Sequence, residues 1–191
     1  MQTLTLLHDV LHGQLKDEKT AELAHRAQQT IDSMSGMLDA LLDINQLEAG
    51  IIRPEPVDFP IHLLLDKLRS EFIYHASAHG LGWRVTPCRL FVHGDPHLLE
   101  QMARNLVSNA IRYTSQGKVL LGCRRHGDRL RIEVWDTGVG IAEDEIPRIF
   151  EEYHQAPGHR GEGGLGLGLA IVQRLGQLLG HAITVRSRLG K

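Results

Sequence analysis

The chain has 191 residues, an apolar share of 42%, a charged share of 23% and a formal net charge of −2. This length and apolar share suffice for one ordinary packed domain with a smaller element beside it. The balanced charge indicates neither a nucleic-acid nor an anionic-membrane partner. No apolar run approaches the ~18 residues of a membrane span, and no signal peptide is visible. We expect a cytoplasmic fragment without membrane contact of its own, whose parent can still be membrane-anchored.

The cysteines and histidines favour no metal site. Cys88 and Cys123 match no metal or redox spacing, and we expect two reduced thiols. His75 and His79 are four residues apart on a predicted helix and could bind one ion together. No third ligand lies nearby in the sequence, so ordinary surface histidines are the better interpretation.

The first fifty residues predict a helical hairpin. Residues 20–49 form one long predicted helix, which Gly50 ends and which Pro54 and Pro56 keep from resuming. Upstream leucines indicate a second helix, joined to the first by a polar turn at residues 14–19. Because two helices bury too little apolar surface alone, we expect dimerisation into a four-helix bundle, with packing against the rest of the chain as the alternative. The apolar stripe of the long helix contains Leu23, Ala27, Ile31, Met34, Leu38, Leu41 and Leu42.

From about Val57 the chain mixes helices and strands. Asp95 can cap the helix that follows it, with Pro96 at the first helical position. One predicted strand alternates strictly, so Leu130, Ile132 and Val134 share a face. Helices are predicted at 61–79, 96–113 and 167–179, and strands at 83–86, 118–124, 130–135 and 182–186.

Three segments carry patterns that folding alone does not require. In the first, Asn105, Asn109 and Arg112 share a helix face apart from the apolar stripe. Asparagine is a middling-to-poor helix former, so two of them one turn apart need a reason. Amide oxygens suit Mg²⁺, and the guanidinium of Arg112 presents a fixed fork of donors to phosphate. A solvated polar face is the alternative.

The other two segments contain glycines. Asp136 precedes Gly138 and Gly140, where the backbone can approach a flat ligand, and its carboxylate can accept a hydrogen bond from an exocyclic amine such as that of adenine. Residues 161–168 form a glycine-rich loop running into a helix start, where N–H groups and the helix dipole favour phosphate. The spacing is neither a Walker loop nor a dinucleotide fingerprint. An ordinary Asp-Thr-Gly turn and a bland glycine loop are the alternatives, but together the segments predict a pocket for a magnesium-bound nucleotide.

In this order the segments resemble the ATP-binding catalytic domain of sensor histidine kinases in two-component signalling. Residues 105–114 are similar to the N box of that family, 136–141 to its first glycine box, 149–155 to its F box and 164–168 to its second glycine box. Residues 41–50 resemble the end of the family's dimerisation and histidine-phosphotransfer hairpin.

The resemblance implies an α+β fold. Residues 1–50 would form part of the hairpin, in a dimeric four-helix bundle. Residues 57–191 would form an α/β sandwich of the histidine kinase/gyrase/chaperone ATPase type, whose mixed sheet is covered by helices on one face. Residues 154–163 would be a mobile lid over the nucleotide.

The resemblance also implies ATP and Mg²⁺ as ligands. Asn109 would hold the metal with Asn105 beside it, Arg112 would contact the phosphates, Asp136 would recognise adenine, and Tyr113 would lie near the ribose and phosphates. Phe150 and Tyr153 would dock the base of the lid, and a core role for Phe150 is the alternative. The remaining implied nucleotide contacts are Gly138, Gly140, Ile141, Gly164, Leu165, Gly166, Leu167 and Gly168.

Both ends of the chain depart from the family pattern. The acceptor histidine of the family lies in a His-Asp/Glu-x-Arg-x-Pro box, for which His8 is the only candidate here. Leu11 and Gly13 stand where that box has its basic residue and its proline. We therefore expect the acceptor box to precede Met1 and the last strand of the domain to lie beyond residue 191.

The implied activity is transfer of the ATP γ-phosphoryl group to a histidine of the hairpin, and from there to an aspartate of a response-regulator receiver domain. We expect a homodimer with no nucleic-acid partner, and a fragment that binds ATP without autophosphorylating. The gyrase, mismatch-repair and chaperone ATPases are a rival class, but they have a glutamate where Asn105 stands. A nucleotide-binding dimeric scaffold or pseudokinase would also fit these segments, and so would a phosphatase-dominant regulator.

Overall fold

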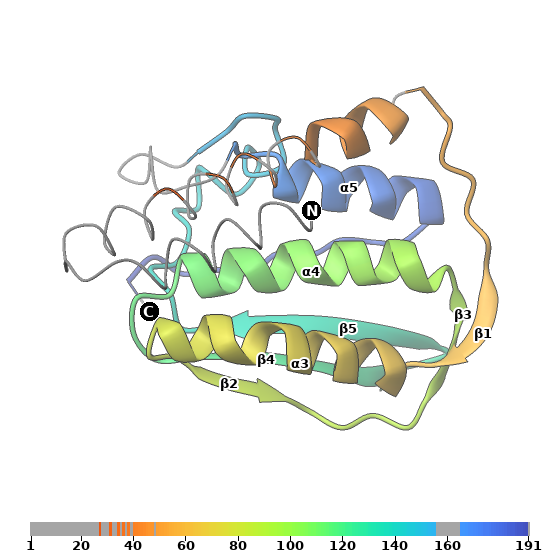
Figure 1. Ribbon diagram of the computed structural model, residues 1–191, viewed down its shortest axis with the longest axis horizontal. Helices are drawn as coiled ribbons and strands as arrows, with labels where there is room; N and C mark the ends of the chain where they lie inside the picture. Colours follow the sequence, from red (N-terminus) through yellow and green to blue (C-terminus); the bar gives the residue numbers. More distant parts are fainter. Residues whose placement is uncertain are drawn as a thin grey trace, which may run out of the picture. The chain divides into compact units, whose positions relative to one another are not determined.

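The computed structural model describes residues 27, 31, 34, 36, 38, 40–47, 49–155 and 165–190. The chain divides into two compact units, Met1–Asp39 and Ala40–Lys191. In the second unit residues 40–47 are helical. The elements that follow them are β1 (Val57–Pro60), α3 (His62–Ala78), β2 (Gly82–Val85), β3 (Phe91–Gly94), α4 (Pro96–Arg112), β4 (Lys118–His126), β5 (Arg129–Asp136) and α5 (Gly168–Leu179) (Figure 1).

The sheet beneath the helices is small and mixed. Its central strand is β4, which pairs in parallel with β2 and antiparallel with β5. β1 and β3 form a separate antiparallel pair, which the sequence patterns did not predict. α3 contacts β2, α4 contacts β4 and β5, and α5 packs on α4 (Figure 1). The predicted α+β fold with a mixed sheet and helices is therefore confirmed, and so are the three predicted helices after residue 57.

The apolar core lies between the sheet and these helices. Val119 and Leu121 of β4 are fully buried, as are Val107 of α4 and Leu175 of α5. The apolar residues of β5 pack against this core, whereas Trp135 on its other face is 57% exposed. The alternation predicted for β5 is thus confirmed.

The strand predicted at residues 182–186 is wrong. This segment lies within the described residues and has no ladder partner in the sheet. Ile183 is half-buried and packs closely on Gly176 of α5, where a Cβ would lie 2.9 Å from Ile183 Cγ1. Ile183 is therefore partly buried against a helix here, without strand hydrogen bonds.

The expectation of two reduced thiols is also wrong. Cys88 and Cys123 form a disulfide, with their Cα atoms 6.5 Å apart and a separation of 35 positions in the sequence. Thr86 N donates to Leu121 O (2.8 Å), which extends the parallel pairing past the end of β2. This extension carries the chain after β2 alongside β4, where Cys123 lies, and no local spacing rule could reveal it.

The structure tests the hairpin only in part. Residues 27, 31, 34, 36, 38 and 40–47 are helical, as predicted for 20–49, and Gly50 follows with a φ of +61°. The upstream helix, the turn at 14–19 and His8 lie outside the described residues. The dimeric bundle therefore stays a prediction.

Two negative results hold for the described residues. No helix among them is long and apolar enough to cross a membrane. Within the same ranges, His, Cys, Asp and Glu side chains form no group of three or more that could hold a metal ion. His79 Nδ1 instead lies 2.8 Å from the carbonyl oxygen of His75.

Asp95 fixes the start of α4, as its position in the sequence predicted. Its Oδ1 accepts hydrogen bonds from the backbone N–H groups of His97 (2.9 Å) and Leu98 (3.1 Å), and its Oδ2 accepts one from Glu55 N (2.9 Å). Burial alone would raise the pKa of this carboxyl group, but the backbone hydrogen bonds outweigh burial and hold the pKa below its ordinary value. Pro96 follows at the first helical position.

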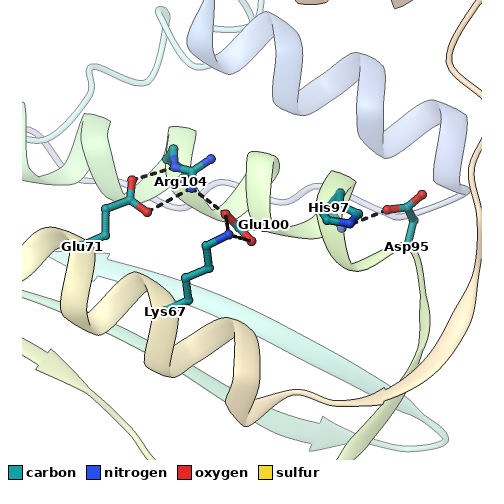
Figure 2. A network of polar contacts seen from close by, with 6 residues as sticks. All are labelled: Lys67, Glu71, Asp95, His97, Glu100 and Arg104. Atoms are coloured by element: carbon teal, nitrogen blue, oxygen red, sulfur yellow. Dashed lines mark hydrogen bonds and ion pairs between the residues drawn. The ribbon is translucent and has the colours of Figure 1, made fainter. Parts of the chain in front are cut away.

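A network of charged side chains joins α3 to α4 (Figure 2). Arg104 donates to both oxygens of Glu71 on α3 (2.7 and 3.0 Å) and to Glu100 (2.5 Å). Glu100 also accepts from Lys67 of α3 (2.8 Å). Burial would raise the pKa of Glu100, but hydrogen bonds from Lys67 and Arg104 outweigh it and lower the pKa. The network aligns the two helices outside the core, although its exposed members add little stability each.

We expect Asp95→Ala to lower the free energy of unfolding by about 1–3 kcal/mol at pH 7, because three backbone N–H groups lose their acceptor. The folded pKa of Asp95 is below its ordinary value, so its contribution is present above about pH 4 and is lost as the pH falls through the folded pKa. Urea unfolding at pH 7 and pH 3 checks this. Asp144→Ala, at an exposed carboxylate, is the control. An equal loss for Asp95→Ala at both pH values would contradict the explanation.

Candidate functional site

Two amide side chains of α4 face the start of α5. Asn105 and Asn109 are half-buried, on a different side of the helix from its buried stripe. A Cβ at Gly168 would lie 3.0 Å from Asn105 Oδ1 and 3.6 Å from Asn109 Nδ2. Asn105 Nδ2 donates to Gln101 O (3.0 Å), which leaves its Oδ1 oriented toward α5. The structure therefore brings two residues of the first predicted segment together with the last glycine of the third.

The first turn of α5 has no side-chain cap. Leu167 occupies the N-cap position without a capping hydrogen bond, and no acidic residue lies in the first turn. The first hydrogen bond of the helix runs from Ile171 N to Leu167 O (2.9 Å). The N–H groups of residues 168–170 lie before it and have no acceptor within the helix. Together with the helix dipole, these N–H groups favour an anion. Leu167 is buried and Leu165 half-buried, and Gly164 lies outside the described residues.

The first glycine loop contacts the opposite end of α4. Asp136 is exposed at the end of β5, and its Oδ1 accepts from Gly138 N (2.9 Å). Val139 N donates to the carbonyl oxygen of Tyr113, the C-cap of α4 (3.2 Å). A Cβ at Gly138 would lie 2.3 Å from that same oxygen. The missing side chain at Gly138 thus allows the loop to lie against the helix end.

The second half of this loop contacts residues 187–190. Ile141 N donates to Ser187 Oγ (2.8 Å), and Gly190 N donates to Val139 O (2.9 Å). Gly140 has a φ of +74° and lies directly against the backbone of Arg188. The sequence patterns did not predict Ser187 at the site. The only signal was the Ser-x-x-Gly spacing near the end of the chain, which gives no contact partner.

The predicted F-box residues lie beside the second glycine loop. Phe150 is half-buried, and Tyr153 is exposed with a left-handed φ of 61°. A Cβ at Gly166 would lie 2.5 Å from the carbonyl oxygen of His154. His154 Nε2 in turn lies 2.6 Å from Glu145 Oε2. Of the predicted lid, only His154 and Gln155 are among the described residues.

Several of the predicted residues thus lie on α4 or against it. Asn105 and Asn109 contact the start of α5, and Tyr113 contacts the loop that follows Asp136. Arg112 is the last residue of α4, and its side chain is exposed. A separate hollow of about 430 Å³ between α3 and the loop before β3 contains none of the predicted site residues. The donor set at α4 and α5 combines hard amide oxygens with backbone N–H groups, and it fits a hydrated Mg²⁺ that carries an anionic ligand.

We expect Gly138→Ala to lower the free energy of unfolding by about 1–3 kcal/mol, since the new Cβ forces the loop away from the end of α4. Urea unfolding measures the loss. Gly36→Ala is the control: a Cβ there meets nothing within 4 Å, and because Gly36 is helical the change should not lower stability. A Gly138→Ala variant as stable as the wild type would show that the loop does not depend on this close approach.

Comparison with known proteins places this arrangement in a family. Residues 94–191 match the family model described as histidine kinase-, DNA gyrase B-, and HSP90-like ATPase. The chain is 34% identical over 178 residues to the sensor histidine kinase GacS of Pseudomonas protegens, which covers 86% of this chain and 19% of that protein. It is 33% identical over 168 residues to the aerobic respiration control sensor protein ArcB of Escherichia coli, covering 83% of this chain and 21% of ArcB.

The fold is similar to that of a solved structure, full-length ShkA in complex with AMPPNP. The TM-score is 0.76 and the sequence identity 28%, over 97% of this chain and 39% of that one. The chain spans about a fifth of the length of the curated relatives named above. It belongs to the histidine kinase-, DNA gyrase B- and HSP90-like ATPase family, as an ATP-binding catalytic domain of the kind found in two-component sensor histidine kinases.

Proposed function

We propose that this chain binds Mg-ATP as the kinase core of a two-component sensor histidine kinase. The observation that carries the proposal is the pair of amides, Asn105 and Asn109, facing the uncapped start of α5 at Gly168. Asn109 holds Mg²⁺ with Asn105 beside it, and Arg112 contacts the phosphates. Asp136 accepts a hydrogen bond from the exocyclic amine of adenine.

Support for the adenine role comes from the arrangement of Asp136. One carboxylate oxygen already accepts from Gly138 N, which fixes the direction of the carboxylate. The other oxygen has no hydrogen-bond donor among the described residues. An exposed carboxylate that is held in place and keeps a vacant acceptor suits recognition of an amine.

The chemistry of transfer rests mainly on positioning. A histidine nitrogen on the hairpin bonds to the γ-phosphorus as the bond to the bridging oxygen breaks, and ADP leaves. Mg²⁺, when bound, neutralises charge on the phosphates. The N–H groups at the start of α5 and Arg112 bind and orient the phosphate chain. The phosphoryl group then passes to a response-regulator aspartate, and the hairpin joins two protomers.

Two different functions compete with this proposal. A nucleotide-binding scaffold or pseudokinase would have the same fold without transfer, and a phosphatase-dominant regulator would act on the receiver domain. Hydrolysis in the manner of the gyrase, mismatch-repair and chaperone ATPases is disfavoured, because Asn105 stands where a glutamate would activate water.

Calorimetric titration with Mg-ATP tests nucleotide binding. We expect the wild-type chain to bind, and Asp136→Asn to bind on the order of 10- to 100-fold more weakly, since a hydrogen bond to a charged group is lost. Asp128→Asn makes the same chemical change in the turn at the far end of β5 and should bind as the wild type does. No binding by the wild type would favour a scaffold with a vestigial pocket.

Incubation with γ-labelled ATP tests the acceptor. Because His8 lacks the basic residue and the proline of the acceptor box, we expect no acid-labile phosphate on this chain. A sensor histidine kinase that carries the acceptor box should become labelled on a histidine under the same conditions and is the positive control. Label that appears on His8, and disappears in His8→Gln, would refute the assignment.

A further inference from the structure

We propose that residues 187–190, here named the C-terminal brace, hold the first glycine loop in the shape that nucleotide binding requires, with Ser187 as the positioning residue. The inference rests on the proposed function of that loop. The loop comprises residues 137–141, directly after Asp136.

The first half of the loop is anchored without the brace. Val139 N bonds to Tyr113 O (3.2 Å), and Thr137 N bonds to Lys118 O (3.2 Å). Tyr113 caps α4 and Lys118 begins β4, so both anchors belong to the packed elements of the second unit. These bonds fix residues 137–139. They do not hold the backbone at residues 140 and 141.

The second half of the loop depends on the brace. Ser187 Oγ accepts from Ile141 N (2.8 Å) in a partly buried hydrogen bond between residues 46 apart in the sequence. Gly190 N donates to Val139 O (2.9 Å), so the brace binds the loop on both sides of Gly140. Ser187 contributes the one side-chain hydrogen bond of this pair, and the bond from Gly190 is purely backbone.

Gly140 makes the contact possible. A Cβ at this position would lie 2.1 Å from Arg188 O and 3.0 Å from Leu189 Cα, far inside contact distance. Its φ of +74° is also in the left-handed region that favours glycine. Glycine is therefore required at position 140 because the brace lies against it. At position 138 glycine is required because the end of α4 lies against it.

A loop that is already held in its binding shape loses less conformational freedom when the ligand arrives. Removal of the Ser187 hydroxyl should release Ile141 N and free the second half of the loop. Asp136 and the bonds to Tyr113 stay in place, so the effect is partial. One hydrogen bond corresponds to roughly a 3- to 10-fold change in affinity.

The experiment compares Mg-ATP affinity and amide hydrogen exchange in the wild-type chain, Ser187→Ala and Ser187→Thr. We expect Ser187→Ala to weaken binding roughly 3- to 10-fold and to speed exchange at Ile141 in the nucleotide-free protein, with little change at Val139, whose N–H bonds to Tyr113. Ser187→Thr keeps the hydroxyl and should restore both. Ser70→Ala, which removes a serine hydroxyl bonded to Asp66 O on α3, is the matched control and should change neither.

The readouts separate this inference from the proposed function. If the wild-type chain does not bind Mg-ATP, the proposed function fails, while faster exchange at Ile141 in Ser187→Ala would still support the brace. Unchanged exchange at Ile141 would overturn the brace. Faster exchange with unchanged Mg-ATP affinity would overturn its role in nucleotide binding, and so would a loss of affinity that Ser187→Thr does not restore.

Discussion

Burial of one side of α4 is the constraint on which the whole site depends. Its apolar stripe, which includes Met102, Val107 and Ala110, packs in the core and fixes the rotation of the helix. Successive residues of a helix are about 100° apart, so a slip of one residue would turn both asparagines away from α5. The Asp95 cap fixes the first residue of α4. It thereby also determines which residue at the other end of α4 contacts the first glycine loop.

Missing side chains shape the site as much as those that are present. Gly168 leaves room beside the two amides, Gly138 admits the carbonyl of Tyr113, and Gly140 admits the backbone of residues 187–190. At each position a Cβ would displace backbone or a polar group of the site. These glycines therefore form contacts between segments, and flexibility alone does not explain them. Close contacts of this kind hold donors in place before a ligand arrives, which is how a small domain can bind a highly charged ligand.

Local patterns predicted the elements that they control. The helical period located α3, α4 and α5, and strict alternation located β5, because both depend on which face of a single element is buried. The same logic failed for 182–186, where half-buried Ile183 packs on a helix and the segment joins no ladder. The strands β1 and β3 were not predicted from the sequence, and each is defined by its pairing with the other.

By itself the sequence determined the chemistry of this protein: two amides one helical turn apart, a carboxylate after a strand, and glycines before a helix start. These residue types and spacings predicted the ligand class, with a solvated polar face and ordinary glycine turns as the alternatives. Only the tertiary structure decided which segments meet, namely Asn105 with Gly168, Ile141 with Ser187, and Cys88 with Cys123. The physical reason is that such contacts join residues 35 or more positions apart. Their geometry is set by packing of the whole core, which no local period records.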